Sequence, residues 1–358
     1  MKKRYIVYAC VILLVALSFV SPPVLPVIQL PGEVVVPWPE GSVLNNWFGH
    51  GLTNTFIATI LTFLILVGLT FSLRARSRTA EEVPTGFYNF FEMIIEFAYG
   101  YVENAAGKWA RNFFPFFMTF ILWIVVANWM ELVPGVDAIG KWEDLSHLRA
   151  EQAVMAAEKQ AEAEGRHLSE EEIHHIEEEA LHEADEANLG DLKRGFFLIK
   201  ASTDENGEKP DDADWTIVPF VRAAATDLNF PLALAIISVL MTQYYGMKAQ
   251  GLKYWKKFFV WDGDAIAKNP LAIMDPAVGI LEFISEIFKI VSFAFRLLGN
   301  IFAGQVLLFV IAALVPVANL LFWHLEFAVG ILQAAVFALL TLTFMTGATE
   351  SHHGEEHH

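Results

Sequence analysis

Arg296 is the residue whose position most needs a chemical explanation, because it lies inside a long apolar helical pattern that runs from Glu282 to Gly304. A charged side chain at the centre of a bilayer costs ~2.5–3.5 kcal/mol or more, and arginine keeps its charge at any accessible pH. Roughly ten apolar residues on each side argue against an arginine that merely reaches from a helix end to the membrane surface. The pattern therefore predicts a functional cation within a membrane.

The helical face that carries Arg296 is lined by small and polar residues. At helical spacing it holds Ser285, Lys289, Ser292, Gly299 and Ala303, with Asn300 and Gly304 beside it. Small residues around a buried cation let a second helix approach closely. We therefore expect this face to meet another helix.

The two apolar segments that end the chain are too long to cross a bilayer upright. Residues 277–315 would form a helix of roughly 58 Å at ~1.5 Å per residue, against a hydrocarbon core of ~30 Å. Residues 317–346 exceed the same limit. We predict a hairpin of two strongly tilted helices around Pro316; the alternative is a break in the first helix at Gly299–Asn300 or Gly304.

Folding this hairpin about Pro316 pairs polar residues across an otherwise apolar interface, since position i then faces about position 632 − i. Arg296 comes within a turn of Gln333. Gln305 comes next to Glu326. Polar groups inside a membrane need partners or water, so the two pairs favour a hydrated path. Two isolated interhelical hydrogen bonds are the alternative, but a buried arginine adds a charge that such bonds do not need.

The composition is that of an integral membrane protein. Of the 358 residues 55% are hydrophobic, and several apolar runs reach the ~20 residues that a spanning helix needs. The net charge of −17 is local, because residues 137–214 hold 23 acidic and 8 basic residues. A nucleic-acid partner is therefore not expected. The single cysteine, Cys10, excludes a disulfide within the chain and a multi-cysteine metal site.

Apolar runs and basic clusters predict an all-α protein with five to six membrane helices. The basic residues 74–78 and 248–257 follow the first and third clear spans, which orients those ends toward the cytoplasm. The predicted parts are 1–20, a signal peptide or N-terminal membrane anchor; 21–50, a Pro-rich, irregular extracytoplasmic segment; 51–136, two membrane helices with a cytoplasmic amphipathic helix between them; 137–222, an acidic, helical extracytoplasmic insertion; 223–348, the Arg296-bearing membrane helices with the tilted hairpin; and 349–358, a polar His/Glu tail.

One helix of the insertion has a clear start signal. Ser169 and Glu172 form a capping-box pattern ahead of a solvated run that extends to residue 188. His175, Glu179 and His182 share a face and could bind a metal ion. Ordinary surface histidines on a charged helix are the favoured interpretation, so we predict no metal site and no cofactor.

Four short motifs resemble those of subunit a of F-type ATP synthases. The run R-L-L-G-N-I-F-A-G at 296–304 is similar to that family's R-L-x-G-N-x-x-A-G signature. The other three are N-W-M-E-L-V-P-G at 128–135, similar to its N-x-x-x-L-x-P-G element; T-D-L-N at 226–229, similar to its T-x-D-x-N element; and L-Q-A at 332–334, similar to an element of its last helix. The resemblance covers residues 45–136 and 223–348, most of the membrane part.

The resemblance implies roles for individual residues. Arg296 would be the essential arginine that faces a ring of c subunits, with Gln333 as its neighbour on the last helix. Lining the outer half-channel would be Glu282, Gln305 and Glu326, with Asp227, Asn229 and Glu131 nearer its mouth. Lys289, Ser292 and Asn300 would belong to the inner path.

This sequence departs from many bacterial relatives at two of these positions. Those relatives have a carboxylate where this chain has Gln305 and a histidine where it has Glu326. The resemblance implies that the family tolerates an exchange of the titratable group between the two positions. Glu326 is therefore the expected proton carrier here.

The resemblance implies a non-catalytic stator subunit in the inner (plasma) membrane that couples a proton gradient to ATP synthesis through two half-channels. Expected partners are the ring of c subunits, the b subunits of the peripheral stalk, the rest of the synthase complex and membrane lipids. The sequence has no G-x-x-x-x-G-K-[ST] loop, which leaves nucleotide chemistry to other subunits. The competing hypothesis is a secondary transporter or channel in which Arg296 binds an anionic solute. Such transporters often have duplicated halves, and no internal repeat is evident.

Overall fold

The computed structural model describes residues 32–39, 51–77, 86–133, 136, 139–187, 192–194, 199–201, 215–251, 254–255, 258, 274–314 and 316–350. The predicted N-terminal anchor and the end of the His/Glu tail lie outside these residues. The chain forms two compact units, each described by itself. The first unit comprises Met1–Gln29, Pro134–Val221 and Gly304–Leu325; the second comprises Leu30–Val133, Arg222–Ala303 and Glu326–His358.

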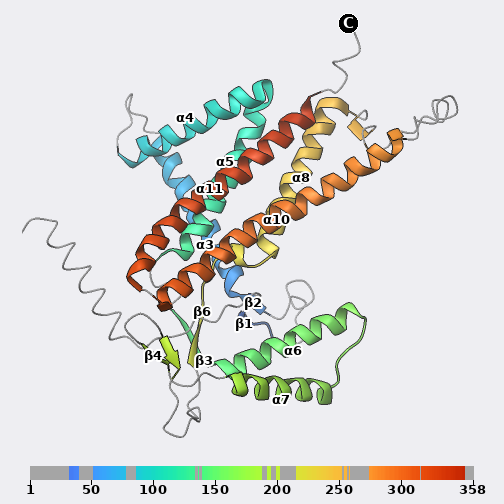
Figure 1. The fold of residues 1–358 in the computed structure, drawn as a ribbon. Coiled ribbons are helices and arrows are strands. Elements are labelled where there is room, and N and C mark those ends of the chain that lie inside the picture. The colour runs from blue at the N-terminus through green and yellow to red at the C-terminus, as the bar shows by residue number, and fades with distance from the viewer. Residues whose placement is uncertain are drawn as a thin grey trace, which may run out of the picture. The chain divides into compact units, whose positions relative to one another are not determined.

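Within the described residues, five helical segments are long and apolar enough to cross a membrane. They contain α3 (Asn54–Ser77), α4 (Phe87–Ala106) joined to α5 (Ala110–Glu131), α8 (Asn229–Gln250), α10 (Met274–Leu314) and α11 (Pro316–Thr349) (Figure 1). The prediction of an all-α, multi-pass membrane protein is confirmed. The ends of α10 and α11 lie within three residues of the limits predicted for the two final segments, because long apolar runs are a strong signal.

The two longest helices are α10 and α11, orange and red in Figure 1. α10 is one helix of 41 residues and α11 has 34 residues. The alternative of a break at Gly299–Asn300 or Gly304 is therefore wrong. At ~1.5 Å per residue α10 measures about 62 Å, longer than a bilayer core is thick, and its strong tilt stays a prediction. Pro316 begins α11, where the missing N–H of proline costs no helical hydrogen bond.

In the second unit, α11 packs against three other helices. The Phe337 ring meets Phe120 of α5 at 5.3 Å and Phe293 of α10 at 4.9 Å between centroids. The buried hydroxyls of Ser238 in α8 and Thr341 in α11 lie 2.7 Å apart. Because lipid tails are as apolar as these side chains, close packing and interhelical hydrogen bonds hold such helices together.

The amphipathic helix predicted between the first two spans is α4. Its Ala98, Val102 and Ala106 are buried, and Tyr99 meets Phe114 of α5 with ring centroids 5.2 Å apart. Its other faces expose Phe87, Phe90, Met93, Phe97 and Tyr101, together with Glu92, Glu96 and Glu103. Gly107, at φ +51°, ends α4 in a conformation that favours glycine. The location of α4 at the cytoplasmic membrane surface stays a prediction.

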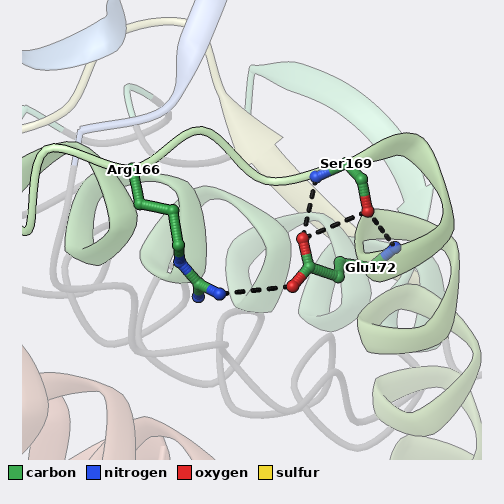
Figure 2. A network of polar contacts seen from close by, with 3 residues as sticks. All are labelled: Arg166, Ser169 and Glu172. Atoms are coloured by element: carbon green, nitrogen blue, oxygen red, sulfur yellow. Dashed lines mark hydrogen bonds and ion pairs between the residues drawn. The ribbon is translucent and has the colours of Figure 1, made fainter.

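The insertion in the first unit contains α6 (Leu145–Ala163) and α7 (Glu170–Ala187), which pack together. The predicted capping box at the start of α7 is confirmed (Figure 2): Ser169 N donates to Glu172 Oε2 at 2.9 Å, and Glu172 N donates to Ser169 Oγ at 3.3 Å. Arg166 lies 3.2 Å from Glu172 Oε1. The hydrogen bonds from Ser169, then the charge of Arg166, hold the pKa of Glu172 below 4.5. The ionised Glu172 carboxylate therefore stabilises the cap fully above the ordinary pKa of glutamate. This stabilisation is lost as the pH falls through the lowered pKa of Glu172.

Three two-stranded antiparallel sheets were not predicted from the sequence. They are β1 (Val34–Pro37) with β2 (Gly51–Thr53), β3 (Gly140–Asp144) with β6 (Trp215–Pro219), and β4 (Leu192–Arg194) with β5 (Ile199–Ala201). The prediction that residues 21–50 are irregular is therefore wrong at β1. Strands of three to five residues show too little alternation to be recognised. The pairing of β3 with β6 brings the two ends of the insertion together.

Candidate functional site

Arg296 lies on an exposed side of α10 and bonds within its own helix. Its Nη2 donates to Ser292 Oγ, one turn earlier, at 3.4 Å. Its guanidinium carbon lies 5.9 Å from the centroid of the Phe293 ring. The cation is thus held at the edge of the packed α10–α11 contact, and its remaining N–H groups are available to an anionic group outside the chain.

The exposure pattern of α10 agrees with the predicted face of small and polar residues. Ser285, Ser292, Arg296, Gly299 and Ala303 are all exposed, and Lys289 is half-buried. Among the described residues, a Cβ added at Gly299 would meet no atom within 4 Å apart from the nearby backbone of its own helix. Packing within the chain therefore does not require a glycine there. Large apolar side chains, such as Phe288 at 63% and Phe295 at 57% exposed, flank the same face.

Two contacts between α10 and α11 lie within about two residues of the predicted hairpin register. Phe293 meets Phe337, and Lys289 Nζ lies 4.4 Å from the centroid of the Phe344 ring. Gln333 is 8% exposed, and its Nε2 has no hydrogen-bond partner within the described part of the chain. The expected contact between Arg296 and Gln333 stays a prediction.

Gln305 and Glu282 occupy different stretches of α10. Gln305 is buried and follows Arg296, whereas the half-buried Glu282 precedes it on the same unbroken helix. At ~1.5 Å per residue the two lie about 35 Å apart along the axis, with Arg296 between them. This separation favours different half-channels for Glu282 and Gln305, and the expectation that both line one half-channel stays untested. The pairing of Gln305 with Glu326, which is half-buried on α11, stays a prediction.

Asp227 lies just before α8, where both of its carboxylate oxygens accept hydrogen bonds. Asn229 N donates to Oδ1 at 3.0 Å, and Thr55 Oγ1, at the start of α3, donates to Oδ2 at 3.0 Å. A Cβ on Gly32 would come 2.5 Å from Thr55 Oγ1, so the segment before β1 can approach this closely only as glycine. Asn229 is the first residue of α8, and its side chain is exposed.

The end of α5 lies against α11. Trp129 Nε1 donates to the carbonyl oxygen of Phe327 at 3.2 Å, and the two rings stack with centroids 4.1 Å apart. A Cβ on Gly330 would lie 3.4 Å from Asn128 Cβ. This contact brings the last turn of α5, which carries the half-buried Glu131, to the turn of α11 that carries Glu326.

Two amide side chains, those of Asn128 and the predicted site residue Asn300, have buried polar atoms without a partner among the described residues. Neither amide atom of the Asn128 side chain finds a hydrogen bond among the described residues, and neither does Nδ2 of Asn300. Buried amides without a protein partner are where ordered water is expected. Both residues are therefore compatible with a hydrated path.

The arrangement suits proton exchange rather than covalent chemistry. A cation, carboxylates and amides lie within or at the ends of apolar spans, where ionisable groups mark ion or proton pathways. Within the described residues, no group of three His, Cys, Asp or Glu side chains could hold a metal ion. In α7, His175 Nδ1 lies 3.7 Å from Glu179 Oε2, and both side chains are exposed.

Sequence reasoning missed Thr55, because its importance comes from a hydrogen bond to a residue 172 positions away. It also missed Gln243 and Glu286, which contact each other between α8 and α10. Gln243 and Glu286 could have been singled out from the sequence, because each is a polar residue inside an apolar span.

Comparison with known proteins gives a consistent result. The profile of the family described as ATP synthase A chain matches residues 56–346. The ATP synthase subunit a of Mycobacterium marinum is 26% identical over 319 residues, which are 87% of this chain and 93% of the relative. The proteins of the same name from Aliarcobacter butzleri and Campylobacter jejuni are 33% and 36% identical over 142 and 135 residues, respectively, covering 39% and 37% of this chain and 58% and 56% of the relatives. The range matched by the family profile contains every site residue predicted from the sequence.

Proposed function

The chain belongs to the ATP synthase A chain family, and on that premise we propose that it is the stator subunit that carries protons to and from a ring of c subunits through two half-channels. The observation that supports this most directly is the exposed Arg296 on a helix long enough to lie tilted along a ring. The subunit is non-catalytic, and proton flow through it drives ATP synthesis on other subunits.

Arg296 meets the ring carboxylate that has just lost its proton. Attraction between the two charges is strong where water is scarce, but the cost of desolvation offsets much of it. The carboxylate can therefore leave the arginine when a proton arrives. The fixed cation also stands between the half-channels, so a proton crosses only by riding on the rotating ring. Each proton that crosses 100 mV releases about 2.3 kcal/mol.

The outer half-channel runs through Glu326 and Gln305, with Gln333 beside Arg296 at its inner end. Its mouth is formed by Asp227, Asn229 and Glu131. The hydrogen bonds from Thr55 and Asn229 N support this role for Asp227, because they orient a carboxylate that stays near the membrane surface. Glu326 is the titratable carrier within the membrane.

The inner half-channel lies along the other part of α10. Glu282 belongs here rather than to the outer channel, because it precedes Arg296 on the helix. Lys289 and Ser292 lie between the two on one face, and Ser292 already bonds to Arg296. Asn300, about one turn after Arg296, is assigned to this path only by the resemblance and lies beside the arginine at its end.

The partners are the ring of c subunits and the b subunits of the peripheral stalk, within the synthase complex of the inner (plasma) membrane. Affinity purification from native membranes, followed by mass spectrometry, is expected to recover a ring of small hairpin subunits and a peripheral ATPase with this chain. A lone oligomer that binds an anionic solute through Arg296 would contradict this and support a secondary transporter or channel.

Gly299 offers a test of the face that meets the ring. Gly299→Leu is expected to lower ATP-driven proton pumping by about tenfold or more, because its side chain would hold the ring away from Arg296. An added Cβ meets no neighbouring atom of the described part of the chain, so the level of the variant in the membrane is expected to be unchanged.

The matched control is Gly68→Leu in α3, where an added Cβ also meets no atom of the chain within 4 Å. Its pumping should equal that of the unmodified complex when measured in the same inverted vesicles. Equal pumping by the Gly299 and Gly68 variants would show that the Gly299 face does not approach the ring.

A further inference from the structure

A second polar cluster lies in the second unit, nearer the start of α10 than Arg296. Tyr254, just after α8, donates from Oη to Gln243 Oε1 at 2.8 Å. Gln243 in α8 donates from Nε2 to Glu286 Oε2 at 2.9 Å. Lys289 donates from Nζ to Glu286 Oε1 at 2.8 Å. Both carboxylate oxygens of Glu286 are therefore held by side chains.

Burying these polar and charged side chains beside an apolar helical span costs free energy. Glu286 is 8% exposed and Tyr254 is 1% exposed, and both charged members belong to a helical stretch apolar enough to span a membrane. Buried ion pairs seldom stabilise a protein more than apolar residues of the same size would. A purely structural connection between α8 and α10 is the simpler reading, but Ser238 and Thr341 show that two hydroxyls suffice to join neighbouring helices of this unit.

Polar side chains connect the cluster to Arg296. Glu286, Lys289, Ser292 and Arg296 follow one another at steps of three and four residues, so they lie along one side of α10. The distance from Glu286 to Arg296 along the axis is about 15 Å at ~1.5 Å per residue. The hydrogen bond from Arg296 to Ser292 closes the last step. A row of this kind can order water from the cluster to the arginine.

The charge of the cluster favours cations. Burial, then the charges of Glu286 and Glu282, raise the pKa of Tyr254, so both carboxylates lie near this phenol and it stays protonated as a hydrogen-bond donor. Glu286 and Lys289 form an ion pair, and Glu282 adds a second carboxylate near Tyr254. Lys289 Nζ also lies against the uncharged Phe344 ring of α11.

We propose that Glu286 is the proton-collecting carboxylate of the inner half-channel, and that Gln243 and Lys289 are its positioning residues. This rests on the proposed function. During ATP-driven pumping, a hydronium ion drawn from the cytoplasm to Glu286 releases its proton along the water row. The proton neutralises the ring carboxylate that leaves Arg296, and the hydronium becomes water.

The test is the dependence of pumping on medium pH in inverted vesicles, where the medium replaces the cytoplasm and supplies the inner half-channel. Glu286→Gln is expected to lower ATP-driven pumping by about tenfold at alkaline pH and little at neutral pH, shifting the alkaline limb by about one pH unit to lower pH. Glu286→Asp, which keeps the carboxylate, should recover most of the loss. Glu103→Gln removes an exposed carboxylate from α4 and should cause no shift.

A structural role would give a different result. If Glu286 only joins helices, Glu286→Gln will lower pumping by the same factor at every medium pH, and that outcome overturns the proposal, as does an unchanged profile. If Glu286→Gln fails to assemble, the Lys289→Gln variant provides the test instead. Removal of the ammonium makes the cluster more negative, so the alkaline limb of the pumping profile of Lys289→Gln must not move to lower pH. Failure of the proposed function would appear separately, as normal pumping by Arg296→Ala.

Discussion

Arg296→Ala is expected to abolish ATP-driven proton pumping in inverted vesicles that carry the assembled complex, lowering the coupled rate by about a hundredfold or more. Without the cation, no fixed charge attracts the ring carboxylate away from its proton. The barrier between the half-channels is lost as well, because a protonated carboxylate can then pass position 296 unchanged. Vesicles stripped of the peripheral ATPase should therefore keep or increase their passive proton permeability. Fluorescence quenching of a pH-sensitive dye measures both.

The comparison variants separate charge from geometry. Arg296→Lys keeps the charge but not the planar fork of donors, and should still lose most coupled pumping. Lys108→Ala removes an exposed cation between α4 and α5 and should pump normally. Coupled pumping by Arg296→Ala at the unmodified rate would refute the role of this residue and the function built on it.

Glu326→Gln is the second large effect that we expect, with pumping and ATP synthesis both reduced by about tenfold or more. The half-buried Glu326 is the titratable group that we propose within the outer half-channel, and glutamine keeps its size but cannot carry a proton. Asp227→Asn should cost only about a few-fold, because a group at the mouth exchanges protons with water directly. Initial rates of acid-driven ATP synthesis provide the comparison.

A double variant tests whether the titratable group can change position. Glu326→Gln combined with Gln305→Glu returns the carboxylate to the place where many relatives carry it, and should recover part of the lost rate. Membrane levels of the subunit, measured by immunoblot, control for assembly. A greater loss from Asp227→Asn than from Glu326→Gln would contradict the assignment of the channel.

Local patterns in the sequence were enough to predict the spans and the Arg296 face. The period of 3.6 residues places Ser292, Arg296 and Gly299 on one side of α10 whatever packs against it, and their exposure agrees. The apolar run of α8 also has a clear local start, because the change from Asp227 to apolar residues is abrupt. The capping box of α7 was also local, since its partners are three residues apart.

The errors arose where local patterns permit more than one outcome. A glycine inside an apolar run is compatible with a break or with a continuous helix, and α10 continues past Gly299 because its helical hydrogen bonds need no side chain there. Glu282 was assigned by resemblance to the same channel as Gln305, and that assignment stays untested; the resemblance did not indicate that one long helix holds the two on opposite sides of Arg296. The short strand β1 carries almost no pattern, and its pairing with β2 depends on the approach of two separate segments.

The sequence by itself determined that this is a membrane protein with a charged residue at the centre of a long helix, because burial in lipid depends on the length and polarity of each segment alone. Only the tertiary structure decided which polar groups meet. The contact of Thr55 with Asp227 and that of Gln243 with Glu286 each join residues far apart in the chain, so no spacing rule could reveal them. The same holds for Gly299, whose open surroundings became visible only once its neighbours in space were known.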